Sequence, residues 1–250
     1  MADRKVEKIV AFSSVVVLVI FNTLFKRYGR EIFGVGNIYA GLADLLATLI
    51  SLGLPILVIH FFTRKSEKVL PYDDFSVREL LGSILFVLGL GFLFRICYAY
   101  IASFLSFIQP ENLKGKGFLV ICIYFVSSVV LPSVLEEILF REKLYNIFER
   151  QGLPVLTTVL LFAFSHSGIH SIINAFVFGF LLQFIYLNSR RLGYCIIIHF
   201  LNNSIAFLAV TAEDGSILQH VANTIPYIFA SCFIIFAIAV FIGRKKKHEQ

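Results

Sequence analysis

The sequence predicts an all-α membrane protein, a polytopic bundle of about eight transmembrane helices that forms one integral membrane domain over residues 1–250. Three observations predict this fold class. Hydrophobic residues make up 58% of the chain and charged residues only 15%, against about 25% charged residues in ordinary soluble domains. Apolar stretches close to the ~20 residues that a spanning helix needs recur along the chain. Lysine and arginine gather in the short segments between these stretches, as they do in membrane proteins.

Eight apolar stretches follow one another, separated by segments with the Gly, Pro, Asn and charged residues that mark helix boundaries. They cover approximately residues 9–25, 38–62, 80–108, 117–140, 154–166, 171–188, 194–210 and 224–243. The first follows Arg4, Lys5 and Lys8 but has no signal-peptide cleavage pattern, so we expect it to remain as a span. The fifth is short for a full crossing, and we expect it to be tilted or packed within the bundle.

The basic residues predict the orientation of the spans. The N-terminal segment, the second, fourth and sixth connections and the C-terminus carry most of the lysines and arginines, so both termini are expected in the cytoplasm. The first external connection, with Lys26, Arg27 and Arg30, is the one discordant segment. The net charge of +6 has the same origin and does not indicate a nucleic-acid partner. The four cysteines lie inside apolar stretches without metal-ligand or disulfide spacing.

Two carboxylates and an arginine lie near the end of the fourth stretch, where ionisable groups are costly and therefore functional candidates. Glu137 and Arg141 are four residues apart and are expected to form an ion pair. Glu136 points about 100° away around the helix, and we expect it ~7–9 Å inside the membrane boundary that Arg141 marks. A carboxylate at low dielectric there is placed to take a proton. Alternatively, all three residues form one satisfied ionic cluster at a helix end.

Further polar residues lie on other spans. His166 follows Phe162 by four residues at the end of the fifth stretch, and His199 and Asn203 share one face of the seventh. Arg95 lies inside the third stretch, where an ion pair with a carboxylate is an ordinary alternative. A histidine near a helix end is also commonly a hydrogen-bonded packing residue. Because lipid-facing polar groups are excluded, a carboxylate, two histidines and an amide on three spans predict one internal site.

His170 follows His166 by four residues, a spacing that invites a zinc interpretation. The pattern lacks the glutamate of H-E-x-x-H, and Gly168 is expected to interrupt the helix between the two histidines. This motif is therefore a weak zinc signal.

Three short motifs in order resemble those of a known family. They are E-E-x-x-x-R (Glu136, Glu137, Arg141), F-x-x-x-H (Phe162, His166) and H-x-x-x-N (His199, Asn203). They resemble the motifs of the CPBP family, the CAAX-protease and bacteriocin-processing (Abi) intramembrane proteases, which include type II CAAX prenyl endopeptidases. The run from Asn174–Gly179 to Gly193–His199 is also similar to that family. The resemblance covers about residues 132–203, within a motif-bearing core of about 117–210.

The resemblance implies an eight-helix bundle with a catalytic cavity open to the cytoplasm and the hydrolysis of peptide bonds. By the same resemblance, Glu136 activates the attacking water with help from His166, His199 and Asn203 stabilise the oxyanion, and Glu137 and Arg141 hold the site. We expect no cofactor, because Asn203 has an oxyanion role that needs no metal. The alternative is a zinc site with the ligands Glu136, His166 and His199 and one open position.

Several functions stay open at this stage. The expected partners are the lipid bilayer and a peptide or protein substrate, such as a bacteriocin precursor, a signalling-peptide precursor or a prenylated C-terminus. Abundant Phe, absent Trp and a compact chain favour a bacterial cell membrane. The alternatives are a non-hydrolytic protein of the same fold, acting in bacteriocin self-immunity or as a partner-binding scaffold, and a small proton-coupled transporter. No internal repeat of the kind common in transporters is found.

Overall fold

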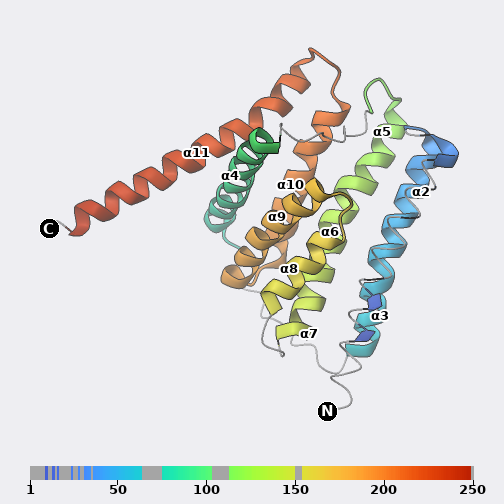
Figure 1. The fold of residues 1–250 in the computed structure, drawn as a ribbon, viewed down its shortest axis with the longest axis horizontal. Helices are drawn as coiled ribbons and strands as arrows, with labels where there is room; N and C mark the ends of the chain where they lie inside the picture. The colour runs from blue at the N-terminus through green and yellow to red at the C-terminus, as the bar shows by residue number, and fades with distance from the viewer. Residues whose placement is uncertain are drawn as a thin grey trace.

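A computed structural model describes residues 36–63, 75–102, 113–149 and 154–248, with scattered positions between 9 and 34. Within these ranges the chain is helical apart from short turns, and it contains no strand. Six helical segments of the described chain are long and apolar enough to cross a membrane: Ile38–Phe61, Val77–Ala99, Phe118–Glu149, Ile169–Ser189, Leu192–Thr211 and Ile217–Ala239. The fold class predicted from the sequence, an all-α polytopic bundle, is confirmed (Figure 1).

The helices follow one another in a simple order, and two of the spans are composite. The second predicted span is α2 (Ile38–Thr48), the π-helical η1 (Leu49–Gly53) and α3 (Leu54–Thr63); the third is α4 (Val77–Ala102). The fourth joins α5 (Phe118–Phe125), η2 (Val126–Val130), α6 (Leu131–Glu137), η3 (Ile138–Leu144) and α7 (Tyr145–Glu149). The last four are α8 (Pro154–Phe164), α9 (Ile169–Ser189), α10 (Leu192–Thr211) and α11 (Ile217–His248).

Seven of the eight predicted stretches are therefore helical over most of their described residues, whereas most of the first, 9–25, and residues 103–108 of the third lie outside the described residues. The predicted short fifth stretch is α8, with 11 residues too short to span a bilayer by itself. The predicted break after it is also present, since Gly168 has φ +84°, a conformation that glycine adopts without strain.

The boundary predicted at Arg141 is wrong. The helical run continues past it to Glu149, and the Arg141 side chain is only 1% exposed. A charged residue often marks a helix end, but a charge whose partners lie inside the bundle can stay within the helix. The depth of Glu136 below the membrane surface stays a prediction.

Two prolines explain two of the π-helical segments. Pro55 follows η1 and Pro132 follows η2. A proline inside a helix lacks an N–H and clashes with the carbonyl four residues earlier, and one widened π turn before it relieves that clash. The spans therefore continue through both prolines, and the segment with η2 and α6 carries Glu136 and Glu137 into the bundle.

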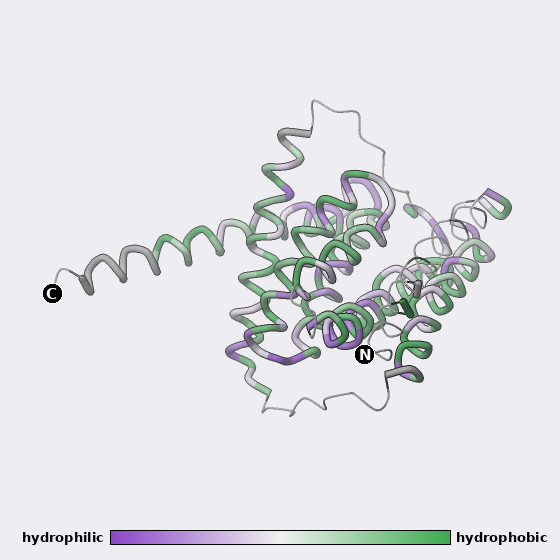
Figure 2. The backbone as a smooth tube through the Cα atoms, turned by 60° about the horizontal axis from the view of Figure 1, so that its bottom comes forward, coloured by the Kyte–Doolittle hydropathy of each residue, from purple (hydrophilic) through white to green (hydrophobic). Residues whose placement is uncertain are grey.

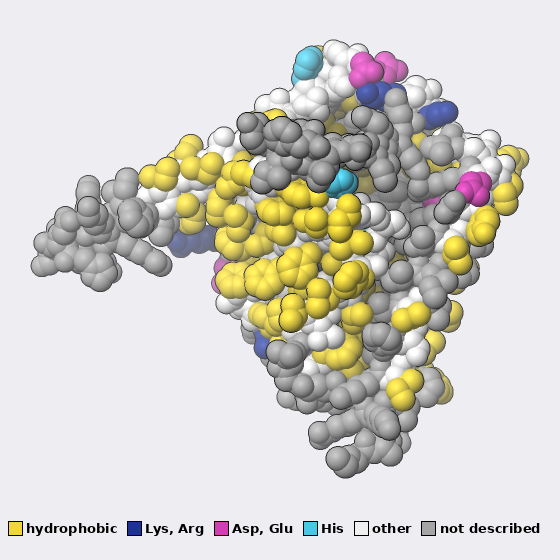
Figure 3. Space-filling model, in the orientation of Figure 1, with side chains coloured by type: hydrophobic (Ala, Val, Ile, Leu, Met, Phe, Trp, Pro, Cys, Tyr) yellow, Lys and Arg dark blue, Asp and Glu magenta, His cyan; other side chains and the backbone are white. Residues whose placement is uncertain are grey.

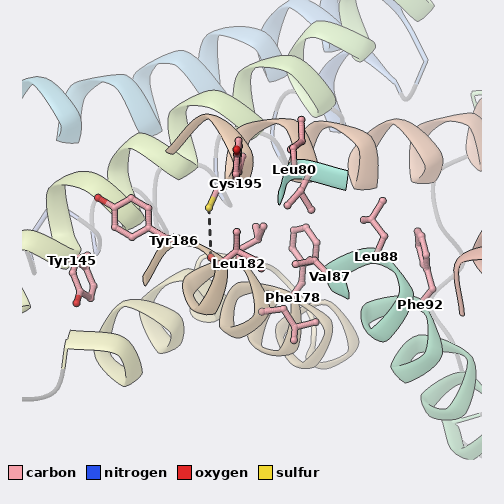
Figure 4. Close-up of a cluster of buried hydrophobic side chains, with 13 residues drawn as sticks. Leu80, Val87, Leu88, Phe92, Tyr145, Phe178, Leu182, Tyr186 and Cys195 are labelled. Atoms are coloured by element: carbon pink, nitrogen blue, oxygen red, sulfur yellow. Dashed lines mark hydrogen bonds between the residues drawn. The ribbon is translucent and has the colours of Figure 1, made fainter. Parts of the chain in front are cut away.

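The bundle has α10 near its centre. α4 and α11 pack on one side of it, α8 and α9 cross in front in the view of Figure 1, and α2, α5 and α6 lie on the other side. One hydrophobic core joins α4, α9 and α10, with Phe92, Phe178, Tyr186 and Cys195 among its buried residues (Figure 4). A second core joins α3, η3 and α8. These two cores hold the helices that carry the predicted site residues.

The outward faces are apolar. Phe180 and Phe184 on α9 and Ile235 and Phe236 on α11 are all exposed, and hydrophobic side chains cover much of the visible face (Figure 3). Hydrophobic residues run along most of each helix, and hydrophilic ones gather near the turns (Figure 2). Such a surface suits lipid rather than water. The chain is a multi-pass integral membrane protein.

Ion pairs join connections at two places in the described chain. At one place Lys114 contacts Asp214 at 2.5 Å, so the connections after α4 and after α10 meet. Hydrogen bonds from Lys114 and Gln219 hold the pKa of the Asp214 carboxyl below its usual range. This exposed contact is therefore present at neutral pH and is lost as the pH falls through the lowered pKa. At the other place Arg191 contacts Glu79 at 2.6 Å, joining the turn before α10 to the start of α4.

Which of these two places is cytoplasmic remains a prediction from the basic residues. A reporter inserted after Gly115 should lie outside the cytoplasm, and a reporter at the C-terminus should lie inside, because the basic segments favour the cytoplasmic side. A pair of enzymatic reporters, each active on one side only, measures this. Two fusions reporting the same side would contradict the predicted number of crossings between them.

Candidate active site

A fully buried ion pair forms the base of the candidate site. Glu137 is 0% and Arg141 1% exposed, and Arg141 Nε lies 3.1 Å from Glu137 Oε2, the pair expected from their four-residue spacing. Arg141 Nη2 also donates to the Gly179 carbonyl oxygen at 3.3 Å, and its Cζ lies 4.5 Å from the centre of the Phe162 ring. The carboxylate, the carbonyl and the ring face surround the buried guanidinium, although its Nε and Nη1 atoms form no hydrogen bond with the described residues.

His199 lies between the two carboxylates of the motif. Its Nδ1 is 2.7 Å from Glu137 Oε1, and its Nε2 is 3.9 Å from Glu136 Oε2. A carboxylate that pairs with Arg141 accepts hydrogen bonds, so the proton of the first contact belongs to His199 Nδ1. The ring is thereby fixed with Nε2 toward Glu136. Glu137 and Glu136, which are adjacent in the chain, thus face opposite nitrogens of one imidazole.

Glu136 differs from Glu137 in its bonding. Its Oε2 atom is buried and has no hydrogen-bond partner among the described residues, and its side chain is 15% exposed. A buried acceptor normally has a donor, from the protein or from water. A water molecule or a substrate group beside Glu136 would supply that donor. The three residues are therefore not one fully satisfied cluster, because only Glu137 is held by both Arg141 and His199.

The His166 side chain forms a hydrogen bond within its own helical turn. Its Nδ1 is 2.9 Å from the Phe162 carbonyl oxygen, which can only accept, so Nδ1 carries the proton. In the neutral ring Nε2 is then the unprotonated nitrogen, the form that a base needs. The Phe162 ring lies 5.0 Å from the His166 ring and 6.1 Å from the His199 ring, centre to centre. Phe162 therefore joins the two histidines, which make no direct contact in the described chain.

Asn203 lies one turn beyond His199 on α10. Its Oδ1 accepts from Asn202 Nδ2 at 3.0 Å, a contact that the sequence motif did not indicate. With the oxygen engaged, the N–H groups of Asn203 are the free end of the amide. The side chain is therefore oriented as a hydrogen-bond donor.

Gly179 is a structural requirement that the spacing of the motifs did not reveal. A Cβ atom there would lie 2.6 Å from Phe162 Cδ1, far too close for a real contact. The absent side chain lets α9 approach α8, and the same residue offers its carbonyl to Arg141. The only sequence signal is the glycine inside the apolar run 174–179.

We expect Gly179→Ala to destabilise the protein by about 1–3 kcal/mol, because the added methyl group must displace the ring of Phe162. The loss should be visible as a lower unfolding temperature of the purified protein in detergent. Gly82→Ala on α4 is the matched control, since no atom lies within 4 Å of its ideal Cβ position and alanine favours helix. Equal thermal stability of the two variants would contradict the packing role.

The remaining polar candidates lie elsewhere. His170 Nδ1 is 2.6 Å from the Tyr98 hydroxyl on α4, so His170 and His166 do not act together. Arg95 does not pair with a carboxylate in the described part of the chain; its guanidinium lies against Phe92 and Phe178.

The side chains do not fit the zinc alternative as they stand. No group of three His, Cys, Asp or Glu side chains in the described residues is arranged to hold a metal ion. Of the three ligands considered, His199 Nε2 and Glu136 Oε2 converge, whereas the hydrogen bonds of His166 stay within its own turn.

Comparisons with known proteins agree with the motif resemblance. Residues 118–205 match the family model described as type II CAAX prenyl endopeptidase Rce1-like. The UPF0177 protein YaiH of Lactococcus lactis is 25% identical over 137 residues, which are 52% of this chain and 57% of that protein. The UPF0177 protein YbdJ of the same organism is 24% identical over 136 residues, with the same coverage.

The match thus spans little more than half the length of these curated relatives. No solved structure matches. The matched family region contains α5 to α9 and most of α10, and it includes every residue of the three motifs. The resemblance to the CAAX-protease family is therefore confirmed, and residues 118–205 form an Rce1-like region within a multi-pass membrane protein.

Proposed function

We propose that the protein is an intramembrane endopeptidase that hydrolyses a peptide bond with a water activated by Glu136. The observation that carries the proposal is the placement of His199 between two unlike carboxylates. Glu137 contacts Arg141 at 3.1 Å and His199 at 2.7 Å, whereas Glu136 Oε2 forms no hydrogen bond and lies 3.9 Å from His199. An acceptor of this kind beside a fixed imidazole suits general-base catalysis in a site shielded from bulk water.

In the proposed reaction, Glu136 takes a proton from water as the water oxygen bonds to the carbonyl carbon of the substrate. The carbonyl π electrons move to its oxygen, which becomes the oxyanion of a tetrahedral intermediate. Collapse of the intermediate breaks the C–N bond, and the proton held by Glu136 passes to the leaving nitrogen. His166, with Nε2 as its basic nitrogen, assists the proton transfers from the end of α8.

The oxyanion is stabilised by His199 and Asn203 in this proposal. Both side chains lie on α10 one turn apart, and the Asn203 amide presents its N–H end. In this proposal His199 donates to the oxyanion from Nε2, while its Nδ1 stays on Glu137 Oε1 at 2.7 Å. Glu137 and Arg141 thus act as positioning residues. Fixed donors of this kind are each worth ~3–4 kcal/mol to an oxyanion.

The substrate is a peptide or protein that reaches the site within the bilayer, with a bacteriocin or signalling-peptide precursor as the proposed class and a prenylated C-terminus as the alternative. The proposed location is a bacterial cell membrane with both termini cytoplasmic. Mass spectrometry of peptides from cells with the wild-type protein or with Glu136→Gln tests the activity. Peptides that depend on Glu136 support it. Identical peptide sets, together with an intact phenotype in the variant, would instead point to a non-hydrolytic role.

We further propose that no metal takes part. Asn203→Ala should then lower the hydrolysis rate by ~10²–10³-fold, as the removal of an oxyanion donor does in other enzymes. A metal that polarised the carbonyl would make this loss smaller. Elemental analysis of active protein after exhaustive chelation gives the independent measurement. Near-stoichiometric zinc that tracks activity, and that is lost in His166→Ala and His199→Ala, would rule out the metal-free proposal.

A further inference from the structure

Arg95 is a partly buried cation that forms no ion pair with the described residues of the bundle. It lies within the α4 span, and its Cζ is 5.6 Å from the centre of the Phe92 ring and 6.0 Å from that of Phe178. Ring faces attract a guanidinium, but they do not replace the negative charge that membrane-embedded arginines normally find.

The side chain does not reach for the membrane surface. Arginines near the end of a span usually extend to the nearer interface, which for Arg95 is the end of α4 beyond Ala99. Arg95 instead folds back along its own helix onto Phe92, one turn earlier, and across to Phe178 on α9. Figure 4 shows these two rings in the core between α4 and α9. The guanidinium is therefore directed into the bundle.

Phe178 connects this cation to the candidate active site. The centre of its ring lies 5.4 Å from the centre of the His199 ring and 6.0 Å from Arg95 Cζ. The guanidinium and the imidazole are thus separated by a single aromatic residue. About three residues of extended peptide, at ~3.3–3.6 Å each, span such a separation.

An unused hydrogen-bond acceptor lies on the same face of α9. Asn174 precedes Phe178 by one turn, and its Nδ2 donates to the His170 carbonyl oxygen at 2.9 Å. The carbonyl can only accept, so the orientation of the amide is fixed, and its Oδ1 is buried without a partner. A cation for a carboxylate and an acceptor for an N–H are the groups that the end of a peptide requires.

We propose that Arg95 binds a carboxylate of the substrate peptide, with Asn174 accepting a neighbouring peptide N–H. The inference rests on the proposed function, since it places the rest of the peptide at Glu136 and His199. The carboxylate is either the C-terminal group, which sets the distance from the cleaved bond to the chain end, or an acidic side chain. Either one neutralises the buried guanidinium only when substrate is bound, so Arg95 determines specificity without taking part in bond cleavage.

The test measures binding rather than turnover. The full-length Glu136→Gln protein in lipid nanodiscs is titrated with three fluorescent versions of one hydrophobic tetrapeptide: a free C-terminal acid, its carboxamide, and a carboxamide with one internal aspartate. An ion pair with Arg95 should make the free acid bind at least about 10-fold more tightly than the carboxamide. The aspartate peptide tells a side-chain carboxylate from the chain end.

Arg95→Gln, made in the same background, should remove this preference and leave the carboxamide affinity unchanged, which also shows that the fold is intact. Arg78→Gln, an exposed arginine in the first turn of the same helix, is the matched control and should keep the preference. If Arg95→Gln does not accumulate in the membrane, the same preference is measured with Arg95→Lys, because lysine keeps the positive charge. A preference for a carboxylate that Arg95→Lys retains supports the proposed site. Loss of the preference in this variant overturns the proposal.

The proposal is overturned if the Glu136→Gln protein, with Arg95 present, binds all three peptides with equal affinity. It is also overturned if this protein binds none of them measurably. Failure of the catalytic proposal gives a different pattern. In that case Glu136→Gln leaves the cellular peptides unchanged, while the preference for a carboxylate and its dependence on Arg95 persist. The measurements therefore distinguish a failure of the binding proposal from a failure of the catalytic proposal.

Discussion

Replacement of Glu136 by glutamine is expected to lower peptide hydrolysis by ~10²–10⁴-fold, the contribution of a positioned general base. The amide keeps the shape of the side chain but cannot take a proton from water. Little stability should be lost, because Glu136 Oε2 has no hydrogen-bond partner in the described chain. The measurement is the initial rate of cleavage of a substrate from the peptide comparison, together with the unfolding temperature of the variant in detergent.

Glu142→Gln provides the control for this change. Glu142 lies in the same helical run, and its side chain is 40% exposed and contacts only Lys143 among the salt bridges described. Its replacement should leave both rate and stability within error of the wild type. If Glu136→Gln cleaves at the normal rate while Glu137→Gln does not, the roles of the two glutamates are reversed and the buried one is the base.

The spans could be predicted from the sequence because a bilayer imposes a simple rule. A helix that faces lipid must be apolar over a fixed length, and some stretches match this rule closely. α10 extends from Leu192 to Thr211, against a predicted 194–210, whereas α11 begins at Ile217, against a predicted 224. The rule fails where a polar residue is paired inside the bundle. The sequence therefore predicts a helix boundary at Arg141, whereas Glu137, Gly179 and Phe162 surround this residue within the helical run.

The candidate site could be predicted only in part. Helical spacing predicts contacts within one span, such as that between Glu137 and Arg141. It cannot predict that His199, 62 positions later, uses one nitrogen for Glu137, because that contact depends on how α10 packs against α6. The sequence likewise gives no sign that η3 begins directly after Glu137, since a π turn follows from tertiary packing as well as from proline.

The aromatic contacts were the least predictable part. The sequence identifies Phe162 only as the first residue of the F-x-x-x-H motif. In the structure its ring faces Arg141 and makes T-shaped contacts with both histidines. Apolar residues are so frequent here that no single phenylalanine stands out; the chain has 28. What distinguishes Phe162 is a glycine on another helix, Gly179, that makes room for its ring.

Replacement of Arg141 by alanine is expected to destabilise the protein by ~3–5 kcal/mol, the cost of leaving one charge of a buried pair uncompensated. Glu137 is 0% exposed, so water cannot replace the lost guanidinium. The change also removes the donor to the Gly179 carbonyl and the cation on the Phe162 ring. The unfolding free energy is measured by denaturant titration in mixed micelles. Arg190→Ala is the control, because Arg190 pairs with Glu149 and the two side chains are 40% and 41% exposed.

A double replacement separates the charge from the packing. If the cost of Arg141→Ala comes mainly from the stranded carboxylate, Glu137→Gln in the same chain should recover part of the lost stability, because a neutral amide is cheaper to bury than a charge. Hydrolysis should stay low in the double variant, since His199 would then lack the carboxylate that fixes its ring. Full stability of Arg141→Ala alone, with normal cleavage, would show that neither charge holds the site.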